Sequence, residues 1–268
     1  MLTHTLFQID AFTSELFGGN PAAVVPLENW LPDDTMQRLA RENNLAETAF
    51  FVPLDGAPDR YHIRWFTPAT EVQLCGHATL ATAFVIFNCL KTNASDTLSF
   101  QSLSGWLHVQ RKGDWLTLDF PTDRLQAAEL PEVARPAFHI PPQEVFLGRE
   151  DYLLVYASES DILSLSPDLK ALKKIPARGF ICTAPGSQSD FVSRCFFPAF
   201  GIDEDPVTGS AHTTLTPYWA ERLGKTALTA IQASERRGFL RCVPAGDRVL
   251  ISGQAVLYLE GKFALATS

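Results

Sequence analysis

Glu71-Val72-Gln73-Leu74-Cys75-Gly76-His77-Ala78 and Glu204-Asp205-Pro206-Val207-Thr208-Gly209-Ser210-Ala211 are two stretches of the chain that match when residue 71 is aligned with residue 204. Glutamate, glycine and alanine coincide at matching places, and each stretch stands just before a segment that we expect to be helical. The segments on either side follow the same order of strand, loop and helix. The match therefore predicts a duplicated fold in which two equivalent helix starts are related by a pseudo-twofold axis.

The sequence around the first stretch predicts an N-terminal lobe of strands and two helices. Segments in which apolar and polar residues alternate, or which are rich in aromatic and β-branched residues, are typical of strands. Apolar residues along one face, after Asp33 as a cap, are typical of a helix. The expected strands are residues 5–11, 48–53, 61–66, 97–100, 106–110 and 115–120, and the expected helices are residues 33–42 and 76–87.

The second half repeats this plan after a proline-rich segment, residues 121–142, where we place the lobe boundary at residue 122. The expected strands are residues 151–156, 179–183 and 190–197, and the expected helices are residues 167–173 and 209–223. Pro217 should kink the last helix or bend its packing. The remaining chain should form strands that are separated by Gly238, Gly246, Gly253 and Gly261.

Composition excludes several classes of protein. The chain has 268 residues, of which 46% are hydrophobic and 19% charged, which is enough to bury a sizeable core in two lobes or one large domain. The net charge of −8 and the lack of a basic run make nucleic acid or an anionic membrane surface an unsuitable partner. No apolar stretch approaches the length of a membrane span.

The N-terminal residues and the cysteines predict a cytoplasmic protein. Met1-Leu2-Thr3-His4 lacks the charged and then apolar pattern of a secretion signal. The five cysteines are odd in number and show no CxxC spacing, which favours reduced thiols over a disulfide framework or a zinc site. The GxGxxG and GxxxxGK[ST] motifs of nicotinamide and ATP enzymes are also missing, so we expect neither a metal nor a cofactor.

The two helix starts have the properties of an anion site. The first turn of a helix leaves backbone N–H groups unpaired and carries a partial positive charge, and glycine allows a ligand to approach closely. Gly76 and Gly209 could therefore face a carboxylate, although each could also be an ordinary turn residue. Cys75 and His77 flank the first start, while Asp205, Thr208 and Ser210 flank the second. An acid, an imidazole and hydroxyls on two matching loops indicate a binding or catalytic site.

These stretches resemble the signature segments of the phenazine-biosynthesis PhzF-like isomerase family. Further segments that resemble the family are Asp10-Ala11-Phe12, residues 17–24 with Gly18-Gly19-Asn20-Pro21, residues 44–50 with Glu47, and Asp190-Phe191-Val192-Ser193-Arg194. The resemblance covers roughly the whole chain in the family's order. It implies a mixed α/β (α+β) fold like that of diaminopimelate epimerase, with two pseudosymmetric lobes, each a curled, mostly antiparallel sheet around a central helix.

The resemblance also implies the domain organisation. We expect lobes at residues 1–122 and 123–261, with a last strand, about residues 262–268, that returns to the first lobe, and a site between the lobes. Many members of the family are homodimers, so we expect a homodimer here.

The same resemblance implies roles for individual residues. Glu47 matches the family's general acid and base, and His77 and Asp205 join it as catalytic candidates. Asn20, Cys75, Gly76, Thr208, Gly209 and Ser210 are expected to bind the substrate. Diaminopimelate epimerase uses two opposed cysteines, but here only Cys75 remains, and the second position falls at Asp205-Pro206. A two-thiol racemase mechanism is therefore not expected.

From the residues alone Glu47 could equally be a solvated loop acid, and it is the resemblance that favours a role in proton transfer. Glu47 precedes the apolar segment Thr48-Ala49-Phe50-Phe51-Val52, and partial desolvation beside it would help the carboxyl group both to take and to return a proton. The sequence thus predicts a cofactor-independent isomerase that moves a proton on a small anionic metabolite. Two alternatives stay open: an amino-acid epimerase or racemase that uses Cys75 as a base, and a non-catalytic protein that binds a small ligand or a partner. A Cys75/His77 hydrolase is disfavoured because neighbouring residues at a helix start rarely aim at one atom.

Overall fold

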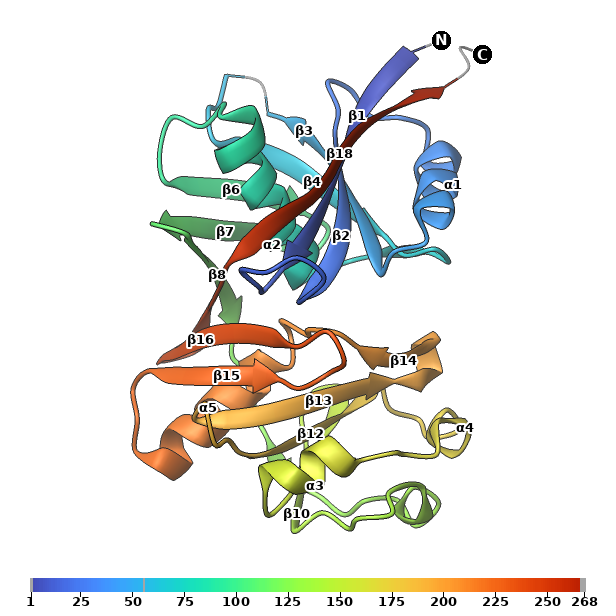
Figure 1. Ribbon diagram of the computed structural model, residues 1–268, viewed down its shortest axis with the longest axis vertical. Helices are drawn as coiled ribbons and strands as arrows, with labels where there is room; N and C mark the ends of the chain where they lie inside the picture. The colour runs from blue at the N-terminus through green and yellow to red at the C-terminus, as the bar shows by residue number, and fades with distance from the viewer. Residues whose placement is uncertain (1, 55, 266–268) are drawn as a thin grey trace. The chain divides into compact units, whose positions relative to one another are not determined.

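The computed structural model describes residues 2–54 and 56–265 (Figure 1), and the chain divides into two compact units. The N-terminal unit comprises Met1–Asp119 with Ser252–Ser268, and the C-terminal unit comprises Phe120–Ile251. The sequence had placed the two boundaries at residues 122 and 261. Within the described residues, none of the helices has the length and apolar character that a membrane crossing requires.

The strands of the N-terminal unit form a mostly antiparallel sheet with two parallel pairs. The strands are β1 (Leu2–Ala11), β2 (Asn20–Pro26), β3 (Glu47–Pro53), β4 (Arg60–Phe66), β5 (Glu71–Val72), β6 (Thr97–Ser102), β7 (Gly105–Lys112) and β8 (Trp115–Pro121). Strand β2 is antiparallel to β1 and parallel to β3, and β4 is antiparallel to β3 and β5 and parallel to β6. The meander β6–β7–β8 is antiparallel, as its turn signals predicted.

The C-terminal unit repeats this pairing scheme. Its strands are β9 (Gln126–Ala127), β10 (Glu144–Leu147), β11 (Asp151–Val155), β12 (Gly179–Pro185), β13 (Phe191–Phe197), β14 (Ile202–Asp205), β15 (Leu228–Gln232), β16 (Gly238–Ala245) and β17 (Arg248–Gly253). Strand β11 is antiparallel to β10 and parallel to β12, and β13 is antiparallel to β12 and β14 and parallel to β15. Each relation has its counterpart in the N-terminal unit, as the duplicated sequence pattern predicted.

The central helix of the N-terminal unit, α2 (Gly76–Phe84), contacts β1, β2 and β3 and buries Leu80 and Ala81 fully. Its residues His77 to Ala83 are all buried, so the helix lies inside the curl of the sheet (Figure 1). The expected helix over residues 76–87 continues instead as a π-helix, η1 (Val85–Leu90), which ends at Lys91 in the left-handed conformation. The helix α1 (Asp33–Asn43) follows its expected bounds and carries Asp33 and Asp34 in its first turn.

The corresponding helix of the C-terminal unit, α5 (His212–Leu223), begins three residues later than expected. Gly209, Ser210 and Ala211 form a tight turn, because their carbonyls accept from the N–H groups of residues 212, 213 and 214. Pro217 lies inside α5 and has no backbone N–H to donate to the carbonyl of Thr213. The N–H of Asp123 donates to that carbonyl instead, at 3.3 Å. The missing helical bond is thus replaced, and α5 runs through the proline as one helix.

Three smaller expectations need correction. The short helix α3 (Glu159–Ser164) was missed, although Ser158 and Asp161 form its capping box, and the helix expected at residues 167–173 shortens to α4 (Leu169–Leu172). Of the glycines expected to separate the last strands, only Gly246 lies in a turn. Gly238 and Gly253 are strand ends where a Cβ atom would lie 2.2 Å from Val207 and 2.3 Å from Phe12, so close packing requires them.

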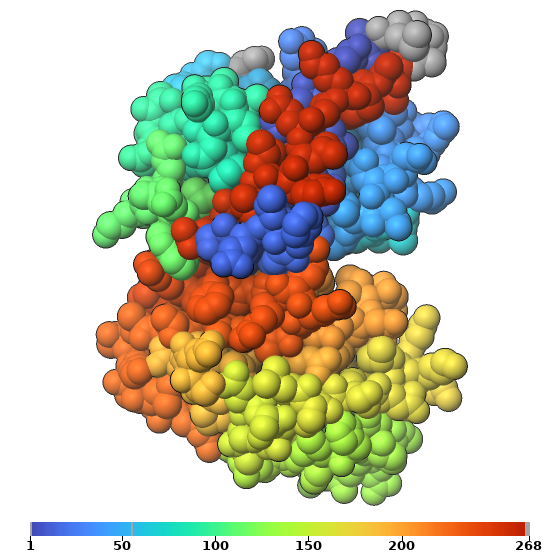
Figure 2. Space-filling model, in the orientation of Figure 1, coloured from blue at the N-terminus to red at the C-terminus, as the bar shows by residue number. Residues whose placement is uncertain are grey.

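The last strand, β18 (Ala255–Leu265), pairs with β1 along its whole length, from Leu2–Leu265 to Ala11–Ala255. It lies at the surface of the N-terminal unit (Figure 2). The return to the first unit therefore begins near residue 252, about ten residues earlier than expected, because all of β1 offers a pairing edge. The predicted end of this strand, residues 266–268, lies outside the described residues.

An arginine–glutamate pair recurs at the same place in each unit. Arg64 donates from Nε and Nη2 to the two carboxylate oxygens of Glu71 at 2.7 and 2.8 Å, and Arg194 makes the same two contacts with Glu204 at the same distances. Each guanidinium lies over the phenylalanine two residues further along, at 5.1 Å from the ring centroid. These pairs bind the central strand of each unit to the loop before its helix.

The Nη1 contacts of the two arginines differ, so we expect substitution of Arg64 and of Arg194 to lower the free energy of unfolding by different amounts. Arg64 Nη1 donates to the exposed Asp33, whereas Arg194 Nη1 donates to the carbonyls of Ile162 and Leu165, at the end of α3. We expect Arg194→Met to lower the free energy of unfolding by about 3 kcal/mol, because it strands both carbonyls and the half-buried Glu204. Urea denaturation measures this, with Arg64→Met as the matched control. A loss no larger than the control's would contradict the capping role of Arg194.

Candidate active site

The N-terminal unit brings together four of the predicted site residues. His77 is 5% exposed in the first turn of α2, and its Nε2 lies 3.2 Å from Oε2 of Glu47, the first residue of β3. On the other side of the ring, Nδ1 lies 3.3 Å from Nδ2 of Asn20 and 3.6 Å from Sγ of Cys75. Glu47, His77, Asn20 and Cys75 therefore form one compact cluster around the imidazole.

The backbone of the neighbouring loop places Asn20 in this cluster. Gly19 adopts φ +60°, and a Cβ atom there would lie 2.0 Å from the carbonyl oxygen of Ala11, so only glycine fits. Asp10, which is 2% exposed, accepts the N–H of Phe17 at 2.9 Å and braces the same loop. Asn20 itself is fully buried at the start of β2, opposite Ala11 on β1. The matched motif residues thus fix where the Asn20 side chain lies.

The contacts of Asn20 determine which nitrogen of His77 carries the proton. The amide nitrogen of Asn20 can only donate, so Nδ1 accepts and the proton resides on Nε2, which faces the Glu47 carboxylate. Burial lowers the pKa of His77 to about 3, so the ring is neutral at physiological pH. A neutral imidazole thus lies with its Nε2–H 3.2 Å from one carboxylate oxygen of Glu47, a close polar approach and not a well-aligned hydrogen bond.

Cys75 caps α2, and Gly76 is the first residue of that helix. The carbonyl of Cys75 accepts from the N–H of Thr79 at 3.2 Å and from its hydroxyl at 2.6 Å. The N–H groups of the first helical turn have no carbonyl partner within their own helix, which makes the helix start suitable for a negative charge. The predicted anion-binding feature and the predicted acid/base thus come from the same unit.

The predicted site residues of the C-terminal unit form a second polar cluster. Asp205, at the end of β14, accepts from the hydroxyl of Thr208 at 2.6 Å. Thr208 and Gly209 are buried, and Ser210 is partly buried. Because residues 209–211 form a tight turn and the helix begins at His212, the second half lacks the regular helix start that its sequence predicted.

Gln232 is a residue of this second cluster that the sequence did not suggest. It is fully buried; its amide nitrogen donates to the Asp205 carbonyl at 2.8 Å and to the Thr208 hydroxyl at 3.1 Å, and its oxygen accepts from the Thr208 N–H at 2.8 Å. Thr208 Oγ1 therefore accepts from Gln232 and donates to Asp205. Since Gln232 lies on β15, far along the chain, only the folded structure reveals that it holds the Asp205–Thr208 loop.

Arg178 was missed as well. Its guanidinium contacts both carboxylate oxygens of the buried Asp151, and Nη2 also donates to Ser210 Oγ at 3.3 Å. Because Ser210 accepts from Arg178, the hydroxyl proton of Ser210 remains available for donation. Arg178 directly precedes Gly179, the first residue of β12, as Glu47 is the first residue of β3, and no sequence signal marked it.

Glu47, Cys75 and His77 each offer one atom within 4.8 Å of the others, so these three could also hold a metal ion.

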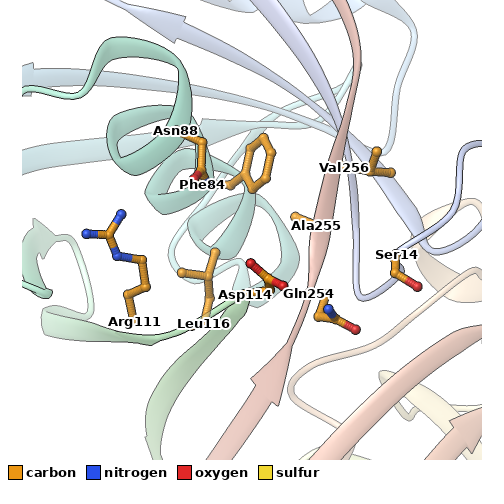
Figure 3. Close-up of a pocket in the computed structure, with 10 residues that line it drawn as sticks. Ser14, Phe84, Asn88, Arg111, Asp114, Leu116, Gln254, Ala255 and Val256 are labelled. Carbon is orange, nitrogen blue, oxygen red and sulfur yellow. The ribbon is translucent and has the colours of Figure 1, made fainter.

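A separate hollow of the N-terminal unit, with a volume of about 250 Å³, lies beside the start of β18 and the end of α2 (Figure 3). Its lining includes Asn88, Arg111 and Asp114, and none of the predicted site residues. Arg111 is paired with Asp96 and lies over Phe87, which is a structural role.

Two buried histidines make stability depend on pH. Burial lowers the pKa of His77 to about 3 and that of His212 to about 4, below the value of about 6.5 expected for an unfolded chain. The unfolded state therefore binds more protons below pH 6.5, so this stabilisation is complete above pH 6.5 and is lost as pH falls toward 4.

For each histidine, we expect the free energy of unfolding to fall by up to about 1.4 kcal/mol per pH unit in this window. His212 Nδ1 donates to the Thr208 carbonyl at 2.9 Å, a bond that asparagine can retain without titrating. His212→Asn should therefore reduce the dependence of the unfolding free energy on pH by the share of one histidine, up to about 1.4 kcal/mol per pH unit. His139→Asn, a change at an exposed histidine, is the matched control. Urea denaturation between pH 4.5 and 7.5 measures the slopes. An unchanged slope in His212→Asn would contradict a neutral buried His212.

Comparison with known proteins agrees with this architecture. The family model described as phenazine biosynthesis-like protein matches residues 9–261. An uncharacterized isomerase of Pseudomonas aeruginosa is 52% identical and covers 97% of this chain and 99% of its own. A crystal structure of a phenazine biosynthesis PhzF family protein from Enterococcus faecalis superposes with a TM-score of 0.94 at 46% identity, covering 98% of this chain and all of that one.

A more distant solved structure shows the wider fold. A probable proline racemase from Agrobacterium radiobacter has a TM-score of 0.65 at 9% identity, covering 98% of this chain and 93% of that one, which is a likeness of fold alone. The expected fold of the diaminopimelate epimerase type is confirmed, and the names of the relatives support an isomerase-type function. The match over nearly the whole length, together with the internal repeat and the segments that suggested it, shows that this chain belongs to the phenazine biosynthesis-like PhzC-PhzF family.

Proposed function

We propose that this protein is an isomerase that moves a proton on a small carboxylate-bearing metabolite, with Glu47 as the group that takes and returns the proton and without a metal or cofactor. The observation that carries the proposal is the approach of Glu47 Oε2 to His77 Nε2, 3.2 Å apart, at the start of α2. The side chain of Glu47 is 13% exposed, so it is largely withdrawn from water and yet reachable by a ligand.

The surroundings of Glu47 suit a proton carrier. A neutral His77 places its Nε2–H 3.2 Å from one oxygen of the carboxylate, so the carboxyl group lies beside a polar group that carries no charge. Because His77 stays uncharged, its imidazole adds no full positive charge beside Glu47 that would weaken the carboxylate as a base. Residues of apolar β3 follow Glu47 directly, and Ala49 and Phe50 are fully buried.

The reaction needs no redox partner. Glu47 removes a proton from a carbon that a carboxylate or a conjugated system activates, and the electron pair delocalises into that system. The same carboxyl group then returns the proton to another carbon on the same face, so a double bond shifts and the overall composition is unchanged. N–H groups at the start of α2, at Gly76 and His77, would stabilise the negative charge that develops, a contribution often worth several kcal/mol.

The residues of the C-terminal unit have supporting roles in this proposal. Asp205 and Ser210 would hold polar groups of the substrate, with Thr208 and Gln232 keeping Asp205 in place and Arg178 orienting the Ser210 hydroxyl as a donor. The homodimer and the cytoplasmic location stay predictions of the sequence.

The Cys75 epimerase remains the second candidate, because Cys75 Sγ lies 3.6 Å from His77 Nδ1, within reach of a base. Cys75 is 6% exposed, and the position that holds the second cysteine of diaminopimelate epimerase falls at Asp205-Pro206. An epimerase would lose its activity in Cys75→Ser, whereas the proton shuttle of Glu47 would retain it within about tenfold.

Deuterium exchange tests the role of Glu47. Small unsaturated carboxylates, aromatic carboxylates and amino acids are incubated with the protein in heavy water, and NMR follows deuterium entering carbon positions and product formation. For any substrate that turns over, Glu47→Gln should lower the rate by about 10²–10⁴-fold, since one positioned acid/base contributes that much. The exposed Glu42→Gln is the matched control.

Full activity in Glu47→Gln would remove Glu47 from this role. A compound that raises the melting temperature but neither exchanges nor turns over would favour a non-catalytic binding protein.

Asp205 is tested in the same assay. Asp205→Asn should raise the KM of the active compound more than tenfold, or lower its turnover, because the side chain can then no longer contribute a full negative charge. Asp203→Asn, an exposed residue on the same strand β14, is the control. Equal kinetics in the two variants would exclude Asp205 from the reaction.

A further inference from the structure

The cluster of Glu47, Cys75 and His77 combines three kinds of donor that zinc prefers. A carboxylate oxygen, a thiol sulfur and an imidazole nitrogen lie within 4.8 Å of one another, with contacts of 3.2 Å from Glu47 to His77 and 3.6 Å from Cys75 to His77. Around tetrahedral zinc, with bonds of about 2.0–2.3 Å, neighbouring donor atoms are roughly 3.3–3.7 Å apart. The two short contacts reach different nitrogens of the ring, so the set lies near the required spacing and one donor must shift to reach a single ion.

From this geometry we infer that the cluster is an inhibitory site for Zn²⁺ or a similar thiophilic divalent cation. A thiolate and a carboxylate balance the two charges of the ion, and the imidazole adds a neutral donor. One ion takes only one imidazole nitrogen, so the third donor must move by roughly 1 Å, within reach of a side-chain rotation. Three protein donors leave a fourth position for water.

Asn20 provides the outer support that such a site needs. A histidine that binds metal through one nitrogen donates the N–H of the other to a fixed partner. If Nε2 binds the ion, Nδ1 must become a donor, and a flip of the Asn20 amide would present its oxygen to Nδ1 in place of its nitrogen, now 3.3 Å away. The fully buried Asn20 can thus serve both the metal-free and the metal-bound form of His77.

The ion would block the reaction. Metal bound to Glu47 occupies the carboxylate that the proposed isomerase uses to carry the proton, so catalysis and metal binding exclude each other. The inference of inhibition rests on the proposed function, whereas the binding of the ion does not.

Cobalt binding tests the site without a substrate. The protein is freed of metal with a chelator and titrated with Co²⁺, whose bond to a thiolate gives a charge-transfer band in the near ultraviolet, and Zn²⁺ should displace the Co²⁺. Cys75→Ser should abolish the band. Cys89→Ser, which changes the partly exposed thiol of η1, should keep it. Asn20→Ala should weaken binding by about 10–100-fold, as loss of an outer-shell partner does.

A band that is absent, or that persists in Cys75→Ser, would overturn the site. Circular dichroism identifies any variant that fails to fold. Glu47→Gln and His77→Gln retain Cys75, so their affinity for Zn²⁺ provides a second measurement of the site. Inhibition is tested in the deuterium-exchange assay: saturating Zn²⁺ should stop exchange, and chelation should restore it. Exchange that survives saturating Zn²⁺ would overturn inhibition, while exchange absent in chelated protein would count against the proposed function and leave the binding result intact.

Discussion

The approach of the His77 imidazole to the Glu47 carboxylate is the interaction on which the account of this protein depends. It joins the first turn of the central helix to the first residue of β3, at 3.2 Å, and Asn20 fixes its direction from the other side of the ring. Gly19 and Asp10 hold the loop that places Asn20, so the cluster is determined by residues on β1, β2, β3 and α2. Burial keeps the imidazole neutral, and a neutral ring beside a carboxylate leaves the charge of that carboxylate intact.

The duplicated fold gives this contact a counterpart of different chemistry. The internal match aligns His77 with Ser210, and Glu47 and Gly179 begin the equivalent strands β3 and β12, with Arg178 directly before Gly179. In the C-terminal unit Arg178 donates to Ser210 Oγ at 3.3 Å and is itself held by Asp151. One unit thus presents a proton acceptor, while the other presents a hydroxyl held as a donor. Meanwhile the pairs Arg64–Glu71 and Arg194–Glu204 kept the same geometry, as expected of residues that support the fold.

Sequence patterns predicted the parts of this structure that depend on local chemistry. Apolar periodicity located most strands and α1, and the repeated Glu and Gly residues located the loops before α2 and α5. Side-chain roles that depend on distant contacts were not visible. Gln232 holds the Asp205 loop from another strand, and Arg194 caps α3 across the sheet. The helix start expected at Gly209 was wrong because three tight bonds precede His212, and the kink expected at Pro217 is offset by a bond from Asp123. Such compensation comes from tertiary structure, which a single sequence does not reveal.

Nitrogen NMR of the His77 ring tests the central claim most directly. With ¹⁵N-labelled protein and His77→Gln to assign the signals, the chemical shifts of both ring nitrogens are followed from pH 5 to pH 8. Because the pKa of His77 is lowered to about 3, we expect a constant spectrum with the proton on Nε2 and none on Nδ1. A proton on Nδ1, or a charged ring anywhere in this range, would contradict the arrangement in which neutral His77 orients Glu47.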